Sequence, residues 1–557
     1  MVAWVEIFGA QPAIPGAIAW GSLFGCVLVA GLGRPPAARR GILDRLGHPL
    51  VFAGLVLLTL GAFRWPSWFV AQELNPDESQ IIAGAITLRE YPVYWKYVDG
   101  TTHGPLNEYL LTLAAWAGLP LSFPGTRLFA AALLGASLLC LWRALRLFLP
   151  EPLARLGILP ALAFWSLCQG ADYLYLSSEL VSVLLVAAAL WTASVTLTAA
   201  RPGAAPAAAT GMLLAAVPLA KMQAAPLAAG MGLFVLAVLA WSRPDHWRRT
   251  SLAVLGGVAT VVLVLATYLQ IYGLWGQFWY SVVWSNLEYA GRGKHPLVEM
   301  PYYFFRLIWP AESFTWFYYG CLAFLLASAR RALGSGAPRR QVALLGAWLL
   351  AGLAHFVVLV PGREFSHYLQ LLVIPLAFLT ALQLAPRGNP AATHPVWRLG
   401  PVVLFLGLAV VPQITNRRPV WQKTADHFFG FTPHPVTAAG TFLHEHRQPG
   451  QRLAVWGWNS QVYVESQLPQ ATRESHSAFE IQPGPLQYFY RQRYLRDLRQ
   501  RRPEWFVDAV GSLQFGFKNR AIDGHETFRE LDRLVRDNYD LVAELDTARI
   551  YRRRDRP

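Results

Sequence analysis

Charged side chains are scarce in this chain of 557 residues, where Asp, Glu, Lys and Arg together make up 15% of the sequence. In soluble domains such residues make up about a quarter of the sequence, so the composition excludes an ordinary water-soluble protein. Hydrophobic residues make up 54%, and Trp and other ring-bearing residues gather near the ends of long apolar runs. Amphipathic rings favour the headgroup region of a bilayer. We therefore predict a protein that its own helices anchor in a membrane.

Cysteine is also rare, and all four cysteines fall inside apolar stretches: Cys26, Cys140, Cys168 and Cys321. None is placed to staple an exported domain. The N-terminus lacks a basic segment and a small-residue cleavage pattern, so we expect no cleaved signal peptide. The last 140 or so residues contain no Gly-rich phosphate loop, nucleophile elbow or metal-spaced His/Cys cluster. From these absences we expect the tail to have a structural or acceptor-facing role.

The formal net charge is +15, which on its own would suggest a nucleic-acid partner. The Arg residues, however, lie in loops between apolar runs and in the tail beyond the last run. Membrane topology and anionic lipid account for that distribution more simply. We expect membrane lipid, and no nucleic acid, as a partner.

Long apolar runs predict a polytopic α-helical protein, because about 20 apolar residues span the hydrocarbon layer and shorter helices are tolerated inside a bundle. About twelve runs qualify: 13–32, 48–70, 126–147, 153–171, 178–200, 206–221, 224–241, 250–272, 312–329, 341–360, 367–386 and 398–415. Every second loop between them is rich in Arg, which marks the cytoplasmic side. This phase places four segments outside: 71–125, 273–311, 361–366 and everything after about 417. The predicted location is a bacterial inner (plasma) membrane.

Two domains follow from this organisation, a transmembrane domain over 1–416 and an extracytoplasmic domain over 417–557. Within the outer loop 71–125, the segment 106–120 is too short and interrupted for a span, and we predict a helix in the membrane interface. In the tail, 452–457 and 504–510 have the pattern of strands, and four apolar residues from Phe528 to Val535 share one helix face. Strands that alternate with helices predict a small α/β domain.

The first outer loop contains the motif NPDES, which places the adjacent acids Asp77 and Glu78 just beyond the second span. Asp77 precedes an apolar-periodic segment, so both acids could simply stabilise a helix N-terminus. Alternatively, one carboxylate faces a cavity and takes a proton from an acceptor hydroxyl. The two roles are compatible, and we predict Asp77 and Glu78 as catalytic residues.

Cations are expected on the same side. Lys221 interrupts two apolar runs near the predicted outer surface, and Arg363 and His367 lie at a later outer turn. Ionisable groups at membrane depth are costly and therefore point to function. Lys221 could instead snorkel to the interface, and Arg363 could pair with Glu364. We predict that all three bind the phosphate of a donor substrate.

Weaker candidates for substrate or metal binding are His103, Asp172, Glu179 and Tyr368. Glu179 also fits as the N-terminal charge of the next helix, which we favour. His103 could meet Asp77 and bind a metal, although a lone His is more often an ordinary hydrogen-bonded residue. A divalent metal therefore stays open, and no cofactor is required.

The pattern resembles the GT-C superfamily of integral-membrane glycosyltransferases, within it the bacterial relatives of protein O-mannosyltransferases and of the aminoarabinose transferase that modifies lipid A (glycosyltransferase families 39 and 83). The matching segments cover roughly 70–380: NPDESQIIAGA, HGPLNEYLLTLAAWAGLP with the downstream Arg127, PLAKMQAAP and GREFSHYLQLLVIPLAFL. The extra span at the N-terminus departs from the usual pattern of the family.

The resemblance implies a catalytic acid in the first outer loop, matched by Asp77, and phosphate binding by Lys221, Arg363 and His367. It also implies a polyprenyl-phosphate-linked sugar as donor, inversion at the anomeric carbon, and an acceptor that is protein, lipid or polysaccharide. The alternative is a transporter or flippase of a lipid-linked or small polar substrate. Transporters usually show internal repeats and midplane charges, whereas the ionisable residues of this chain gather at one face.

Overall fold

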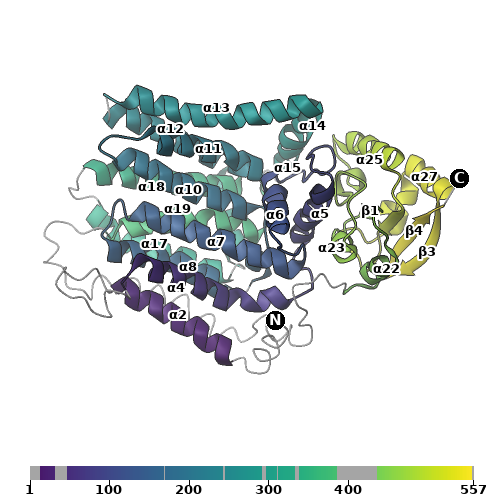
Figure 1. Cartoon of the computed structure of the whole chain (residues 1–557), viewed down its shortest axis with the longest axis horizontal. Helices are drawn as coiled ribbons and strands as arrows, with labels where there is room; N and C mark the ends of the chain where they lie inside the picture. Colours follow the sequence, from purple (N-terminus) through teal and green to yellow (C-terminus); the bar gives the residue numbers. More distant parts are fainter. Residues whose placement is uncertain are drawn as a thin grey trace.

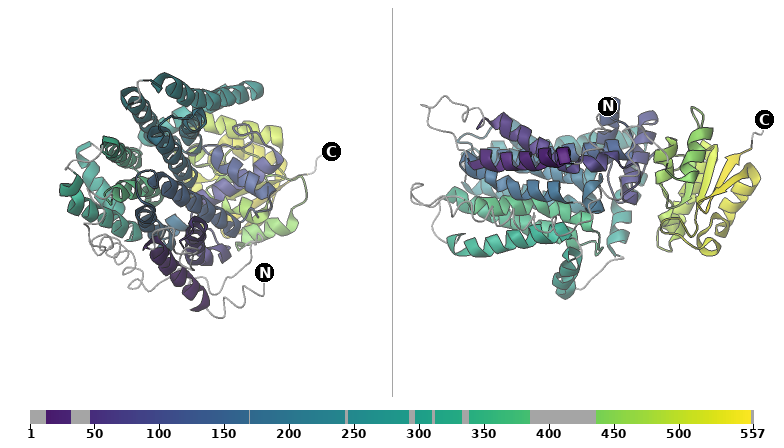
Figure 2. Two further views of the ribbon diagram at one scale, coloured as in Figure 1. Left: turned by 60° about the vertical axis from the view of Figure 1, so that its left-hand side comes forward. Right: turned by 90° about the horizontal axis from the view of Figure 1, so that it is seen from below.

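The computed structural model describes residues 13–31, 47–168, 170–242, 245–291, 297–309, 312–332, 338–384 and 436–554. The predicted span at 398–415 and the predicted domain boundary at 416/417 lie outside these residues. Figure 1 shows a bundle of long helices, with a smaller strand-containing domain at one end. The view from below in Figure 2 gives the same arrangement.

Eleven helices of the described ranges correspond to the other eleven predicted spans: α2 (Ala13–Gly31), α4 (Pro49–Arg64), α7 (Phe123–Leu145), α8 (Glu151–Leu167), α10 (Glu179–Thr198), α11 (Ala204–Ala220), α12 (Ala225–Ser242), α13 (Trp247–Tyr272), α17 (Glu312–Ala332), α18 (Pro338–Leu359) and α19 (Gln370–Leu382). Six segments are long and apolar enough to cross a membrane, and four more are shorter apolar helices. The chain is therefore a helical membrane protein, as predicted. Because these helices are apolar on most faces, they bury one another's side chains in one extended core.

Local sequence explains where the bundle helices begin. The side chain of His48 accepts a hydrogen bond from the N–H of Leu50, and Pro49 occupies the first position of α4. Ser122 caps α7 by accepting from the N–H of Gly125. Both arrangements satisfy N–H groups that have no partner inside the helix.

Short helices connect the long ones, and those labelled in Figure 1 lie at the end of the bundle that carries the strand-containing domain. The short helices are η1 (Trp65–Phe69), α5 (Pro76–Glu90), α6 (Leu106–Trp116), α9 (Ala171–Leu174), η2 (Met222–Ala224), α14 (Trp275–Phe278), the π-helical turn η3 (Trp279–Trp284), α15 (Ser285–Gly291), η4 (Leu297–Glu299), α16 (Met300–Ile308) and η5 (Ser366–Leu369). The predicted helix at 106–120 forms as α6 but ends earlier. Gly118 turns the chain there at φ +101°, a value that glycine adopts readily.

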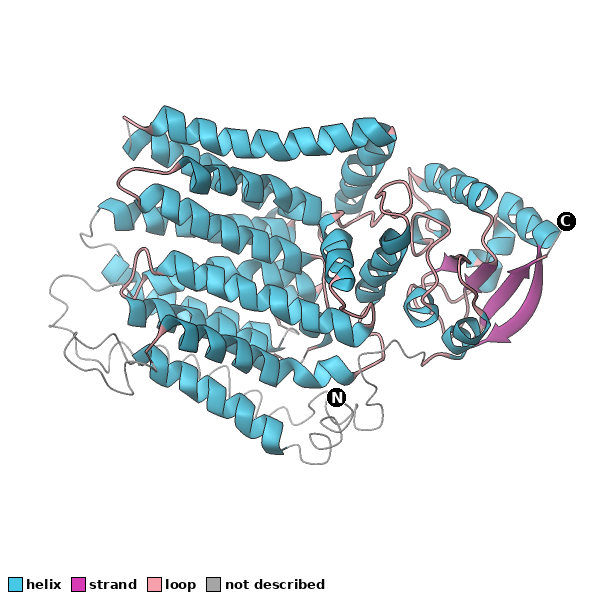
Figure 3. Cartoon of the chain, in the orientation of Figure 1, coloured by secondary structure: helices cyan, strands magenta, loops and turns pink. Residues whose placement is uncertain are grey.

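The C-terminal domain is α/β, as predicted, and Figure 3 shows its strands packed among helices. Its elements are α22 (Ala438–His446), β1 (Leu453–Gly457), α23 (Gln461–Ser466), α24 (Ala478–Ile481), α25 (Gln487–Arg501), β2 (Trp505–Ala509), α26 (Arg520–Asp523), η7 (His525–Thr527), α27 (Arg529–Asn538), β3 (Tyr539–Leu545) and β4 (Ala548–Arg553). The sheet order is β1-β2-β4-β3, in which β1 and β2 are parallel and the other pairs are antiparallel. The sequence predicted β1, β2 and the apolar face of α27, but not β3 and β4, whose exposed residues lack a clean alternation.

The segment 71–125 and the C-terminal domain are joined by buried polar contacts. The Thr87 hydroxyl of α5 accepts from the N–H of Gln470 at 2.9 Å, and the N–H of Asp99 donates to the carbonyl of Arg473 at 2.8 Å. The Asp99 carboxylate also pairs with Arg493 of α25 at 2.9 Å, and both side chains are almost fully buried. Buried, satisfied polar contacts of this kind hold two elements in one geometry. The small domain therefore supports the loop that contains Asp77 and Glu78.

Candidate active site

Asp77 is the accessible one of the two adjacent acids in the NPDES motif. It occupies the first turn of α5, where Asn75 is the N-cap and its side chain accepts from the N–H of Asp77 at 3.0 Å. A third of the Asp77 side chain is exposed, and its Oδ2 lies 3.6 Å from Nε2 of His367. The Asn75 cap thus fixes the backbone position from which the Asp77 side chain projects. The side chain is free to reach a substrate.

Glu78 has a different environment, which favours a structural role over the predicted catalytic one. Its side chain is fully buried and accepts from Nε and Nη2 of Arg127 at 2.9 and 2.8 Å. Arg127 also donates to the carbonyls of Ser67, Val70 and Gln72. A buried carboxylate held on both oxygens by one guanidinium has no path to a substrate hydroxyl. The pair instead ties α5 to α7 and to the end of η1.

Lys221 does not snorkel, because it is 3% exposed and forms an ion pair with Glu179 at 3.0 Å. Its ammonium also donates to the Ser178 hydroxyl at 2.7 Å and lies 5.3 Å from the ring centre of Tyr368. Glu179 begins α10, as predicted for an N-terminal charge, but its carboxylate is also the counter-ion of Lys221. The Lys221 charge is therefore compensated by Glu179 in a buried ion pair.

Arg363 does not form the ion pair with Glu364 that was the alternative to phosphate binding. Glu364 pairs instead with Arg306 at 3.1 Å. The guanidinium of Arg363 lies 5.0 Å from the ring centre of Tyr289, in cation–π geometry. In the part of the chain that the structure describes, no carboxylate forms an ion pair with Arg363. Its charge remains for a ligand.

His367 and Tyr368 connect Asp77 to these cations. Nδ1 of His367 lies 3.1 Å from the hydroxyl of Tyr175, and the rings of His367 and Tyr368 meet edge to face at 4.8 Å. When the Tyr175 hydroxyl donates to Nδ1, the proton of the neutral His367 ring is on Nε2, the nitrogen that faces Asp77. The Tyr368 hydroxyl is in turn 2.9 Å from that of Tyr289.

The remaining candidates take supporting positions. Nε2 of His103 lies 2.6 Å from Glu108, which agrees with the alternative of an ordinary hydrogen-bonded histidine. Burial lowers the pKa of His103 and the Glu108 carboxylate raises it, with a net rise above the ordinary value. Asp172 accepts from the side-chain amide of Asn75 at 3.2 Å and so braces the N-cap of α5. Among the residues that the structure describes, neither belongs to a group of three or more His, Cys, Asp or Glu side chains close enough to hold a metal ion.

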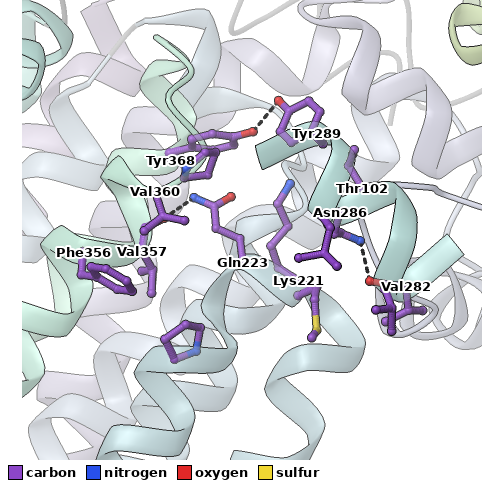
Figure 4. Close-up of a pocket in the computed structure, with 15 residues that line it drawn as sticks. Thr102, Lys221, Gln223, Val282, Asn286, Tyr289, Phe356, Val357, Val360 and Tyr368 are labelled. Atoms are coloured by element: carbon purple, nitrogen blue, oxygen red, sulfur yellow. Dashed lines mark hydrogen bonds between the residues drawn. The ribbon is translucent and has the colours of Figure 1, made fainter. Parts of the chain in front are cut away.

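A cavity of about 210 Å³ opens beside Lys221 (Figure 4). Lys221, Tyr289 and Tyr368 form its polar end, and Figure 4 shows the Tyr hydroxyls and the Lys221 ammonium turned toward one space. The rest of the wall is largely apolar and comes from α12, α15, α18 and the residue that follows α18: Pro226, Leu287, Phe356, Val357 and Val360. One polar end and an apolar wall suit an amphiphile whose headgroup is anionic.

Close approach of backbone explains the glycine of the HGPL segment. A Cβ on Gly104 would lie 2.1 Å from the carbonyl oxygen of Leu219, and the N–H of Gly104 donates to the carbonyl of Ala220 at 2.9 Å. Only glycine fits there. The outer loop is thereby anchored to the end of α11, one residue before Lys221.

Some site residues were not predicted. Tyr289 and Tyr175 carry no motif that would mark them, and Glu108 is separated from His103 by a turn that periodicity does not reveal. Arg127 belonged to the resemblance but had no assigned role. Their positions depend on contacts between distant segments.

One group in the described residues could hold a metal ion, Asp508, His525 and Glu526 of the C-terminal domain. Asp508 also pairs with Arg520 at 2.7 Å, and Glu526 with Arg549 at 2.8 Å. The two guanidinium groups already compensate both carboxylates, so the group is explained as an ion-pair network.

No protein-family model and no curated protein matches the chain. Among solved structures, it is similar to ArnT from Cupriavidus metallidurans bound to undecaprenyl phosphate, with TM-score 0.54, 13% identity, and coverage of 90% of this chain and 97% of that one. The apo state of ArnT aligns with TM-score 0.53 and 12% identity over 90% of this chain and 98% of that one. A likeness that spans nearly all of both chains establishes the architecture and leaves the chemistry to the site residues. The chain has the membrane GT-C fold that the sequence resemblance predicted.

Proposed function

We propose that the protein is a glycosyltransferase that moves a sugar from a polyprenyl-phosphate donor to a hydroxyl acceptor outside the cytoplasm. The observation that carries the proposal is the position of an accessible carboxylate, Asp77. It lies 3.6 Å from His367, whose ring packs against Tyr368 at the polar end of a cavity with an otherwise largely apolar wall. An amphiphilic sugar phosphate needs both surfaces. The GT-C fold and the bound undecaprenyl phosphate of ArnT support the same class of donor.

The proposed reaction is one inverting displacement. The acceptor oxygen attacks the anomeric carbon while the bond from that carbon to the phosphate oxygen breaks, and the polyprenyl phosphate leaves with the bonding electrons. Asp77 takes the acceptor proton and later releases it to water. His367 orients the carboxylate through its Nε2 nitrogen. The phosphate leaves as a stable anion and needs no general acid.

Arg363 would stabilise the charge that develops on the leaving phosphate, since it carries no carboxylate partner among the described residues. Lys221 would share its ammonium between Glu179 and the incoming phosphate. The proposal places these groups, the outer loops and a domain that begins near 417 on the extracytoplasmic face of a bacterial inner membrane. The basic loops then lie on the cytoplasmic face.

The test is donor consumption by purified full-length protein incubated with a panel of polyprenyl-phosphate sugars, each with and without a chelator. Asp77→Asn should reduce turnover by about 10² to 10⁴-fold, the usual contribution of a general base. Asp245→Asn is the matched control, because Asp245 is exposed near the start of α13, at the other end of the bundle. Equal activity of Asp77→Asn and the wild type would refute the proposed base. A loss on chelation would add a metal to the mechanism.

The transporter alternative makes the opposite prediction. A carrier would move a lipid-linked substrate across the vesicle membrane without breaking the bond between sugar and phosphate. The donor would then stay chemically intact with both the wild type and Asp77→Asn. Product analysis therefore separates the two functions.

A further inference from the structure

A second cavity, of about 510 Å³, lies where the segment after α5 meets the C-terminal domain. Lys96 and Tyr97 line it from the outer loop, and Arg452, Arg473 and Arg501 line it from the domain. We call it the junction pocket. Tyr91, at the end of α5, belongs to it as well. Since α5 has 15 residues and rises about 1.5 Å per residue, the pocket lies about 20 Å from Asp77.

The junction pocket is strongly basic. Four cations line it, and among the described residues on its wall one carboxylate, Glu504, accompanies them. A second carboxylate, Asp497, lies buried behind the wall, 3.3 Å from Arg473 and 3.6 Å from Arg501. The cations therefore outnumber the acids, and such a concave basic surface concentrates anions.

The cations are held in place before any ligand arrives. Arg452 lies 3.8 Å from the ring centre of Tyr91, and Arg501 lies 5.0 Å from that of Tyr97. Arg501 also donates to the carbonyl of Ala471 at 2.9 Å. Side chains that are already ordered lose little conformational entropy when they bind. Arg452 and Arg501 are therefore pre-organised for binding, unlike mobile arginines on a protein surface.

Arg473 is the least satisfied of the four. It is 8% exposed, its Nε lies 3.3 Å from the Asp497 carboxylate, and its Nη1 has no hydrogen-bond partner among the described residues. A buried guanidinium nitrogen without an acceptor is costly, so a ligand with several oxygen acceptors would gain by binding there. Burial, together with the neighbouring charges of Arg473 and Arg452, also lowers the pKa of Arg501. An anion would relieve that repulsion.

We propose that the junction pocket is an anion-binding site for a phosphate group, separate from the cavity beside Lys221 and independent of glycosyl transfer. A phosphate monoester or diphosphate offers enough oxygens to engage Arg452, Arg473 and Lys96 together. The group can belong to an anionic lipid, to a phosphorylated saccharide or to free phosphate.

The test is calorimetric titration of full-length protein in phosphatidylcholine nanodiscs with inorganic pyrophosphate, glucose 1-phosphate or short-chain phosphatidylglycerol, and the tightest ligand identifies the source. Arg452→Gln and Arg473→Gln should each weaken binding at least tenfold. Arg452 is half-exposed, so its variant should fold even if Arg473→Gln does not. Arg499→Gln, exposed on the same helix as Arg501, is the matched control and should bind normally.

A donor-cavity variant, Arg363→Gln, separates the two sites. Binding that survives Arg363→Gln but falls with Arg452→Gln supports the proposal. Binding lost with Arg363→Gln alone, equal weakening by Arg499→Gln, or no binding of any of the three ligands would overturn it. None of these outcomes depends on transferase activity.

Discussion

The adjacent acids Asp77 and Glu78 should give opposite phenotypes, because one faces the site and the other is locked in the protein. Arg127→Met removes both charge-assisted hydrogen bonds to Glu78 and three more to backbone carbonyls, and leaves a fully buried carboxylate without a counter-ion. Breaking a buried pair in this way costs about 3–5 kcal/mol. Glu78→Gln keeps the shape and one acceptor, so its cost should be smaller, about 1–3 kcal/mol.

Asp77→Asn should leave stability nearly unchanged. The side chain is a third exposed, and the loss of its charge at the helix N-terminus costs about 0.3–1 kcal/mol. The turnover of the Asp77→Asn variant should nevertheless fall by about 10² to 10⁴-fold. Glu78→Gln should unfold more readily and retain most of its turnover per folded molecule.

The assay pairs thermal unfolding in detergent, followed by Trp fluorescence, with donor consumption normalised to folded protein. The combined variant Glu78→Gln with Arg127→Met removes both charges and should be more stable than the sum of the single effects predicts, by about 0.5–3 kcal/mol. The reasoning fails if Glu78→Gln melts with the wild type and loses turnover as Asp77→Asn does. That result would make Glu78 the base.

Three further predictions follow from other parts of the structure. Lys221→Met should destabilise the protein by about 3–5 kcal/mol by stranding Glu179, and adding Glu179→Leu should restore most of the melting temperature; no recovery in the double variant would contradict the pairing. Gly104→Ala should cost about 1–3 kcal/mol and reduce turnover, because the new Cβ meets the Leu219 carbonyl, and wild-type melting and turnover would refute that close approach. Burial raises the pKa of Glu480 from about 4.5 to about 8, so the folded protein binds this proton more tightly than the unfolded chain and loses stability as pH rises between these values. Glu480→Gln should therefore make the melting temperature depend less on pH in that window. Parallel plots of melting temperature against pH for the variant and the wild type would refute this.

The order of the spans, the membrane character and the α/β tail followed from the sequence because each depends on local patterns. Hydropathy over about 20 residues marks a span, and the basic loops fall between the same runs that the structure shows as helices. The gathering of Asp77, Lys221, Arg363 and His367 at one end of the bundle also followed from counting spans, since residues at alternate turns share a membrane face.

Tertiary structure alone decided which of these groups is available. Asp77 and Glu78 are neighbours with the same carboxylate chemistry, yet Arg127, 49 positions from Glu78, forms an ion pair with Glu78 and not with Asp77. Glu179 likewise neutralises Lys221 from another helix, and Arg306 draws Glu364 away from Arg363. Ion pairs form through space with whichever partner the packing brings within about 4 Å, and no local pattern encodes that choice.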